Sequence, residues 1–219
     1  MPMLYGTYRS RATRNVWLAI KAGLDLPLTP VTQGYRLADP LADDAALNTL
    51  SPAFLAMSPA GAIPVLRDGD LVIAESLAIN LYLAKAYGGD LGPRDAAEEA
   101  LMLQWAFYGA TAVEPEAVAV MYVFSEQRHD SDAGRAELSQ RAAKLQRPLG
   151  VLDAHLAAHG HMVGNRFTVA DVNMAEIVRY AANDPGLVVA FPALQGWLAA
   201  CQARPAFQKM WALRLAEPM

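Results

Sequence analysis

Two short stretches place hydroxyl or carboxyl side chains at the predicted start of a helix. Ser10 precedes an amphipathic run that predicts a helix ending at Gly23, and Glu75 and Ser76 open a run that predicts a helix ending at Tyr87. Free N–H groups and the positive end of the helix dipole favour an anion at such a point. Each stretch is therefore a candidate anion-binding site, with plain helix capping as the alternative.

The elements that would carry these stretches alternate between strand and helix over residues 1–85. Asp68 and Gly69 lie between two apolar runs and are a strong hairpin signal. The predicted order is β-α-β-(α)-β-β-α, with strands at residues 3–6, 28–31, 63–67 and 71–74, and helices at 10–23, 43–50 and 75–87.

Residues from 95 onward show helical patterns and no convincing strand. Pro115 is expected to kink or divide the first of these helices. Thr168 and Asp171 have the spacing of a capping box, which assigns them to structure and not to chemistry. The predicted helices cover residues 96–124, 130–159, 168–180, 192–203 and 205–213. We therefore expect an α/β domain over 1–85, a linker over 86–94 and an all-helical domain over 95–219.

Composition excludes several classes of partner. The chain has 219 residues, a net charge of −4, a pI near 5.5 and 54% apolar residues, so it can bury a sizeable core. This charge gives no electrostatic reason to expect nucleic acid or an anionic membrane as a partner. No signal segment opens the sequence and no apolar run is long enough to span a membrane, so a cytoplasmic location is expected.

Cysteine and histidine content argues against a metal site. Cys201 is the single cysteine, so neither an internal disulfide nor a cysteine metal cluster is possible. His155 and His159 are four residues apart and could ligate a metal from one helical face, but no acidic third ligand stands with them. We predict that these histidines belong to a solvated helix end and that the protein binds no metal.

Two segments match patterns of a known family. Residues 58–66 (SPAGAIPVL) and 71–79 (LVIAESLAI) are similar to NPxGKVPVL followed by LxESxAI, and residues 164–171 (GNRFTVAD) resemble Gxx(F/L)(S/T)(I/V)AD. Together, in this order, they identify the chain as a member of the glutathione transferase family, of the cytosolic bacterial type. The resemblance covers essentially the whole chain.

This resemblance implies a thioredoxin-like N-terminal domain that binds glutathione as co-substrate, followed by a C-terminal helical bundle. It implies that Pro64 follows a cis bond, so that the N–H and C=O of Ile63 are open to the cysteinyl part of glutathione. Ser76 would then bind the γ-glutamyl carboxylate, and Glu75 would lie near the ammonium group.

The family also implies a hydroxyl that stabilises the glutathione thiolate, since a free thiol has a pKa of roughly 8.5. Ser10 is the preferred donor because it precedes the first helix, whose free N–H groups would also face the sulfur. Tyr8 is a competitor. The other hydroxyls in this part of the chain are those of Tyr5, Thr7 and Thr13.

Two further expectations follow from the resemblance. Ala62 stands where the family pattern has a lysine for the glycyl carboxylate of glutathione, which weakens the electrostatic part of the site. A second, hydrophobic substrate would lie between the domains, with Tyr8, Tyr108 and Tyr122 as candidate contacts.

The resulting prediction is a homodimeric detoxifying transferase in which the glutathione thiolate attacks small hydrophobic electrophiles. One alternative is a glutathione-dependent isomerase of a small unsaturated diketo acid, whose carboxylates would need Arg9 or Arg11. Another is a non-catalytic module of the same fold that binds ligands or proteins. The arginine-rich start of the first helix could also take a different anionic thiol or a phosphate.

Overall fold

The computed structural model describes residues 1–218. The chain forms two compact units, one from Met1–Gly89 together with the chain from Pro205 onward, and the other from Asp90–Arg204. The last helix, predicted within a helical domain over 95–219, therefore groups with the N-terminal unit. Within the described residues, no helix is long and apolar enough to cross a membrane.

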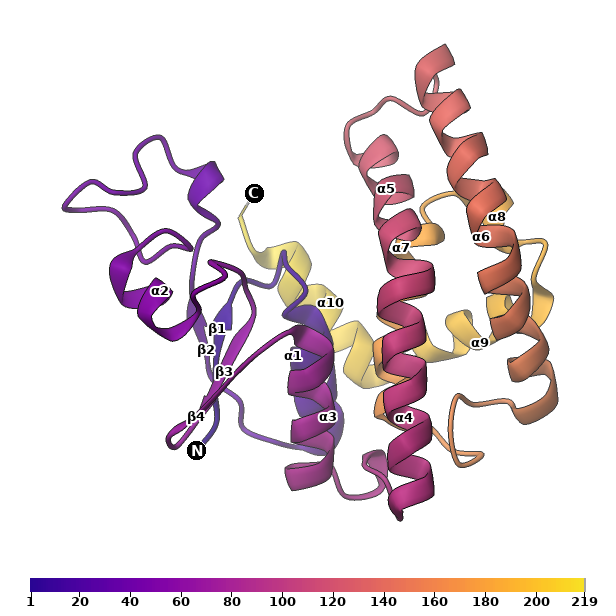
Figure 1. Cartoon of the computed structure of the whole chain (residues 1–219), viewed down its shortest axis with the longest axis horizontal. Coiled ribbons are helices and arrows are strands. Elements are labelled where there is room, and N and C mark those ends of the chain that lie inside the picture. The colour runs from indigo at the N-terminus through magenta and orange to yellow at the C-terminus, as the bar shows by residue number, and fades with distance from the viewer. Residues whose placement is uncertain (219) are drawn as a thin grey trace. The chain divides into compact units, whose positions relative to one another are not determined.

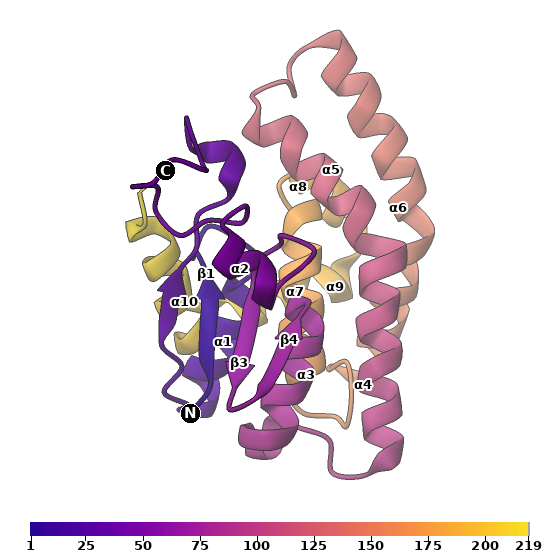
Figure 2. The same ribbon diagram turned by 60° about the vertical axis from the view of Figure 1, so that its left-hand side comes forward.

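The N-terminal unit is built on a four-stranded mixed sheet. Its strands are β1 (Met3–Gly6), β2 (Leu28–Pro30), β3 (Val65–Asp68) and β4 (Leu71–Ala74), in the order β2-β1-β3-β4 (Figure 2). β1 runs parallel to β2 and antiparallel to β3, and β3 and β4 form the predicted hairpin. Gly69 has a φ of 60° in the two-residue turn, a conformation that glycine adopts without steric cost.

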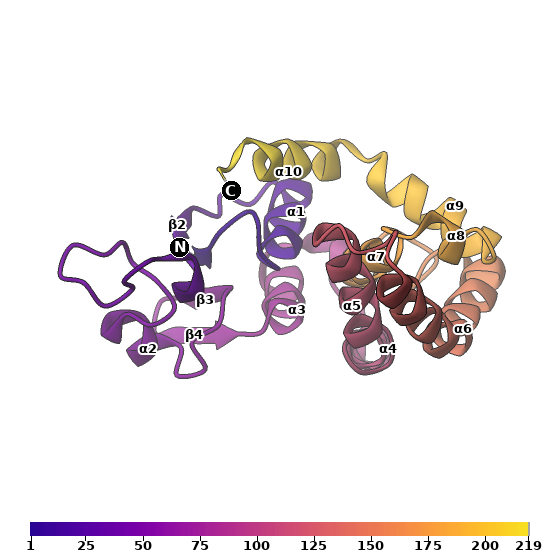
Figure 3. The same cartoon turned by 90° about the horizontal axis from the view of Figure 1, so that it is seen from above.

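Helices cover both faces of this sheet. α1 (Thr13–Ala22) and α3 (Ser76–Tyr87) lie on one face, and α10 (Pro205–Ala216) lies beside α1 (Figure 3). On the other face, Phe54 of the short α2 (Pro52–Met57) packs against Val31 and Val65. A 3-10 turn, η1 (Gly34–Arg36), follows β2, and η2 (Gly89–Leu91) follows α3. This is the predicted thioredoxin-like fold.

Two local predictions for this unit are wrong. The first helix begins at Thr13 and not at Ser10, because residues 8–12 form hydrogen-bonded turns before the helix. The short helix predicted at 43–50 is a series of turns, pinned where the Asn48 amide donates to the carbonyls of Pro40 and Ala46. A helix forms directly afterwards, where Pro52 has the fixed φ suited to a first helical position.

α10 is held against α1 by aromatic packing. Trp17 of α1 is completely buried, and its ring meets that of Phe207 edge to face at a centroid distance of 5.0 Å. Phe207 in turn stacks on Trp211, 5.7 Å away. Burial of large rings stabilises the contact between these helices, so the end of the chain is fixed against its beginning.

The second unit is entirely helical, as predicted. Its helices are α4 (Ala96–Tyr108), α5 (Glu114–Ser125), α6 (Asp132–His159), α7 (Val169–Ala181), α8 (Pro185–Val188) and α9 (Pro192–Gln202). A π-helical turn, η3 (Gly109–Val113), joins α4 to α5, and the three form a nearly continuous rod in Figure 1. The predicted division near Pro115 is confirmed: this proline occupies the first turn of α5, where its missing N–H costs little.

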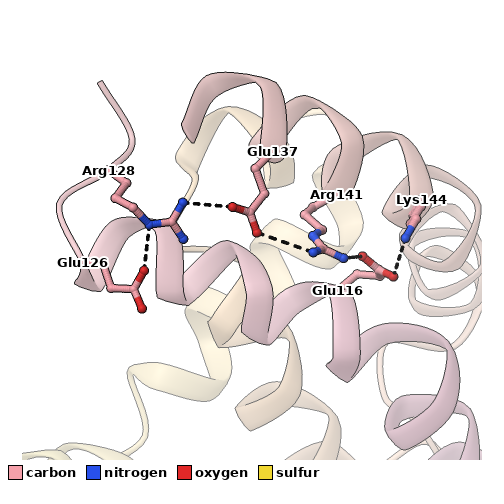
Figure 4. A network of polar contacts seen from close by, with 6 residues as sticks. All are labelled: Glu116, Glu126, Arg128, Glu137, Arg141 and Lys144. Carbon is pink, nitrogen blue, oxygen red and sulfur yellow. Dashed lines mark hydrogen bonds and ion pairs between the residues drawn. The ribbon is translucent and has the colours of Figure 1, made fainter. Parts of the chain in front are cut away.

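A chain of alternating charges ties α5 to α6 (Figure 4). Glu116 binds Arg141 at 2.9 Å and Lys144 at 3.1 Å, and Arg128 binds Glu137 at 2.9 Å. The Arg128 guanidinium lowers the pKa of the Glu137 carboxyl below its usual value. These charged side chains are partly exposed to solvent, so each ion pair contributes little to stability. The row of ion pairs mainly links neighbouring side chains of α5, α6 and the loop between them.

The carboxylate of Asp171, at the start of α7, is the acceptor of several hydrogen bonds that connect parts of the helical unit. This carboxylate is fully buried and accepts hydrogen bonds from the Thr168 N–H (2.9 Å), the Met162 N–H (3.1 Å) and the Trp197 indole N–H (2.9 Å). The Thr168 side chain completes the predicted capping box. One carboxylate therefore joins α7, the loop before it and α9.

We expect Asp171→Ala to lower the free energy of unfolding by at least about 3 kcal/mol, because several buried donors lose their acceptor at once. Asp95→Ala is the matched control. It removes an exposed N-cap carboxylate that accepts from the Glu98 N–H, and such a loss costs about 1 kcal/mol. Urea unfolding of both variants measures the difference, and equal losses would contradict the central role of Asp171.

Candidate functional site

In the turn before α1, the Ser10 hydroxyl donates one hydrogen bond and accepts another. Ser10 Oγ donates to the Thr7 carbonyl at 2.7 Å and accepts from the Ala12 N–H at 3.1 Å. The Ser10 carbonyl also accepts from the Thr13 side chain at 3.2 Å. Ser10 is thus not the residue that caps α1, although it does bind a free N–H just before the helix.

A glycine allows the start of α1 to approach the Ile63–Pro64 segment. A Cβ atom on Gly6 would lie 3.3 Å from the Ala12 Cβ and 3.7 Å from the Pro64 Cα, so the end of β1 is closely packed between the two. The Ile63–Pro64 peptide bond is cis, as the family resemblance implies, and Pro64 is buried while Ile63 is half-buried. The structure therefore brings the Ser10 turn and the Ile63–Pro64 segment to the same end of the sheet.

The start of α3 is joined to α1 by a buried polar network. Ser76 is 4% exposed, and its Oγ accepts from the Arg14 guanidinium at 3.0 Å. The Asn15 amide donates to the Ser76 carbonyl at 2.9 Å and to the Asn80 side chain at 2.7 Å. The Asn80 amide donates to the Arg14 carbonyl at 3.2 Å. These bonds join the start of α3, the second candidate anion site, to the first turn of α1, the helix that follows the Ser10 turn.

Glu75 stands at the turn between β4 and α3 in an unusual backbone conformation. Its φ is 71°, a region that residues other than glycine rarely adopt, and its side chain is exposed. Such conformations persist only where the surroundings impose them, and they are frequent at ligand-binding sites. The following residue, Ser76, is fixed by its hydrogen bonds to Arg14 and Asn15 of α1.

Arg14 is a part of this site that the sequence predictions missed. It is 1% exposed and belongs to the helix that follows the Ser10 turn, with its charge beside the Ser76 hydroxyl. A positive charge next to a helix N-terminus strengthens the preference of that point for an anion. The signal in the sequence was a charged residue within the buried face of α1.

The other hydroxyls considered for catalysis have different surroundings. Tyr5 packs against the apolar cluster of Val31 and Val65. Thr7 Oγ1 is buried and has no hydrogen-bond partner within residues 1–218. The side chain of Tyr8 is half-buried, and its backbone N–H donates to the Glu217 carboxylate at 2.9 Å.

The position of the missing family lysine is open to solvent. Ala62 is exposed, and its carbonyl accepts from the Ser58 hydroxyl at 3.2 Å. The side chain at this position therefore carries no charge, in contrast to the lysine of the family pattern.

The two remaining predicted contacts lie in the helical unit. Tyr108 is half-buried at the end of α4, and its hydroxyl donates to the Pro148 carbonyl at 3.3 Å. Burial raises the pKa of this phenol. Tyr122 of α5 is 53% exposed, so its ring is available to a ligand.

The cysteine and two of the histidines lie in packed surroundings in the helical unit. Cys201 is 2% exposed in α9, and burial raises the pKa of its thiol far above the usual value. His155 bonds through Nε2 to the Met162 carbonyl at 2.9 Å, and its ring lies 4.7 Å from that of His159. In the part of the chain that the structure describes, no three His, Cys, Asp or Glu side chains are grouped as metal ligands would be.

Comparison with known proteins agrees with this geometry. Residues 4–91 match the N-terminal domain of glutathione S-transferases, and residues 101–205 match the C-terminal domain. The chain belongs to the glutathione S-transferase family. The family and enzyme class predicted from the two sequence segments are thus confirmed.

Similar proteins extend over most of the chain. Glutathione S-transferase 3 of Zea mays is 37% identical over 165 residues, which cover 72% of this chain and 74% of that protein. The structure of glutathione S-transferase III in its apo form is 33% identical, covers 100% of this chain and 99% of that chain, and superposes with a TM-score of 0.77. Glutathione S-transferase I, solved with lactoylglutathione bound, is 25% identical, with coverages of 97% and 99% and a TM-score of 0.80.

The buried thiol of Cys201 generates a test with a defined pH dependence. Because its pKa is raised, the thiolate that reacts with disulfide reagents stays scarce between pH 7 and 9. We expect native protein to react very slowly with an aromatic disulfide reagent, at a rate that still rises about tenfold per pH unit up to pH 9, because a thiol whose pKa lies above the range gains thiolate throughout it. The same protein unfolded in guanidinium chloride should rapidly release one equivalent of the reagent's aromatic thiolate per chain. Rapid labelling of the native protein would contradict the prediction.

Proposed function

We propose that this protein conjugates glutathione to small hydrophobic electrophiles, with Ser10 as the hydroxyl donor to the glutathione sulfur. The observation that carries this proposal is the meeting of the Ser10 turn, the Ile63–Pro64 segment and the start of α3. A hydroxyl, an open strand-like backbone and an anion site are what a thiol peptide with a free carboxylate needs. The relative that carries lactoylglutathione supports a glutathione derivative as the ligand.

Glutathione would bind along this end of the sheet. In our proposal, the N–H and C=O of Ile63 pair with its cysteinyl residue in the manner of an added strand. The γ-glutamyl carboxylate binds at the N–H groups and hydroxyl of Ser76, where Arg14 adds a buried positive charge. Glu75 is exposed and free to approach the ammonium group.

Catalysis then requires the Ser10 proton to change its acceptor. In the absence of ligand the hydroxyl donates to the Thr7 carbonyl. When a thiolate arrives, rotation about the Cβ–Oγ bond redirects this proton to sulfur, while Oγ still accepts from the Ala12 N–H. That N–H polarises the hydroxyl and makes it a better donor, so the thiolate is favoured over the thiol. The thiolate attacks the electrophile and the leaving group departs.

Three finer parts of the proposal rest on the resemblance. Tyr8, Tyr108 and Tyr122 are the proposed contacts of the hydrophobic co-substrate, and Tyr122 is exposed enough to serve. A homodimer and a cytoplasmic location are what the family implies. Of the two cations that the isomerase alternative could use, Arg9 directs its Nε to the Glu217 carbonyl at 2.7 Å, which leaves fewer of its N–H groups for a substrate carboxylate.

The first test is a titration of bound glutathione, following its thiolate absorbance against pH. Wild-type protein should hold the thiol pKa well below the free value of roughly 8.5. We expect Ser10→Ala to return the pKa toward that value and to lower kcat on the order of 100-fold, as for loss of one donor to a reacting anion.

Ser125→Ala is the control for this titration, because it removes a hydroxyl that only bonds to the Tyr122 carbonyl within α5. It should leave the thiol pKa unchanged. If the wild-type protein binds no glutathione at millimolar concentrations, the non-catalytic alternative is favoured. The absence of a lysine at Ala62 would then account for the lost binding.

A second test concerns the electrophile. We expect conjugation of glutathione to chlorodinitrobenzene, measured by the absorbance of the thioether, to be saturable and to depend on Ser10. Replacing Tyr122 by alanine should raise KM for this aromatic substrate several-fold, because a loss of ring contact is worth about 1 kcal/mol. An unchanged KM in that variant would remove Tyr122 from the proposed site.

A further inference from the structure

The turn that carries Ser10 is hydrogen-bonded to Arg214 of α10 and to Glu217, which directly follows this helix. One carboxylate oxygen of Glu217 accepts from the Tyr8 N–H at 2.9 Å, and the other accepts from the Arg9 N–H at 2.6 Å. The Arg9 Nε donates to the Glu217 carbonyl at 2.7 Å, and the Arg214 guanidinium donates to the Tyr8 carbonyl at 2.9 Å. We call these four bonds between Tyr8, Arg9, Arg214 and Glu217 the tail clamp.

The tail clamp is anchored because α10 is anchored. Phe207 and Trp211 stack on each other, and Phe207 meets the buried Trp17 of α1. The Arg214 guanidinium lies 5.4 Å from the centroid of the Trp211 ring, at cation–π distance. Arg214 lies in α10 and Glu217 directly follows it, so both extend from a helix that aromatic packing holds against α1.

The clamp acts on the two residues that determine where the Ser10 hydroxyl points. Ser10 Oγ is bonded to the Thr7 carbonyl on one side, and Tyr8 and Arg9 are the residues between Thr7 and Ser10. Glu217 supplies the acceptor for the N–H groups of both intervening residues. Two charge-assisted bonds to consecutive amides hold the backbone of the turn in one conformation.

We propose that Glu217 is a positioning residue for the conjugation reaction, fixing the turn so that the Ser10 hydroxyl is preorganised for the glutathione sulfur. This inference rests on the proposed role of Ser10. Glu217 makes its bonds to the turn and not to the Ile63–Pro64 segment or to Ser76, so its effect belongs to the thiolate and to kcat, with the binding of the tripeptide left largely intact.

Positioning and simple electrostatics predict opposite results. A carboxylate near the sulfur disfavours the thiolate, so removing its charge alone would lower the pKa of bound glutathione. Loss of positioning raises that pKa, because the hydroxyl that stabilises the anion is no longer held toward it. The sign of the change therefore separates the two, and a purely structural role would leave the pKa where it is.

The experiment compares wild type, Glu217→Ala, Glu217→Gln, Ser10→Ala and the double variant Ser10→Ala/Glu217→Ala by the same pH titration and by steady-state kinetics. Asp25→Asn is the matched control, since it removes an exposed carboxylate of the same unit beyond the other end of α1. Thermal melting confirms that each variant is folded at the assay temperature. Glu217→Gln keeps one acceptor oxygen and is the milder replacement.

We expect Glu217→Ala to raise the thiol pKa by about one unit and to lower kcat about tenfold, with KM for glutathione within about twofold of wild type. Glu217→Gln should fall between Glu217→Ala and wild type, and the Asp25→Asn control should match wild type. The double variant should equal Ser10→Ala, because Glu217 acts through that hydroxyl.

An unchanged or lowered thiol pKa in folded Glu217→Ala would overturn the positioning role. If Ser10→Ala raises the pKa and the Glu217 variants do not, only this inference fails. If Ser10→Ala itself leaves the pKa unchanged, the proposed donor and the inference built on it fail together.

Discussion

The buried polar network between α1 and α3 is the constraint on which the candidate site depends. Arg14, Asn15, Ser76 and Asn80 exchange bonds of 2.7 to 3.2 Å away from solvent, and each bond fixes both distance and direction. Apolar packing alone would let two helices slide, whereas buried polar groups tolerate few arrangements because an unmade bond is costly. The start of α3 is therefore held in register with the turn that precedes α1.

The fold could be predicted from the sequence because its signals are local. The hairpin signal at Asp68 and Gly69, the capping box at Thr168 and the break near Pro115 each depend on neighbouring residues, and each appears in the structure. The start of α1 was misplaced because Ser10 is a good capping residue whose hydroxyl does bind a free amide, but in a turn that precedes the helix. Residues 43–50 failed for a similar reason, since the loop is organised by the Asn48 side chain.

In the candidate site, too, the residues marked by a local sequence pattern could be predicted, and the residues that reach the site by long-range contacts could not. The Ile63–Pro64 and Glu75–Ser76 pairs stand out because a family pattern marks them, and the structure brings them to one end of the sheet. The groups that support them do not stand out. Arg14 reaches Ser76 across 62 positions and Glu217 reaches Tyr8 across 209, and no pattern in the sequence announces either contact. Long-range hydrogen bonds become visible only when the chain has folded.

The place of α10 has a consequence for how the protein is made. During synthesis the sheet, α1 and α3 leave the ribosome long before α10, and until then Trp17 lacks the ring of Phe207 that covers it. The growing chain therefore carries a large apolar ring on α1 that Phe207 covers only once α10 has been made. All of the helical unit, Asp90–Arg204, is translated within that interval. The domain that comes first in the sequence is the last to be completed.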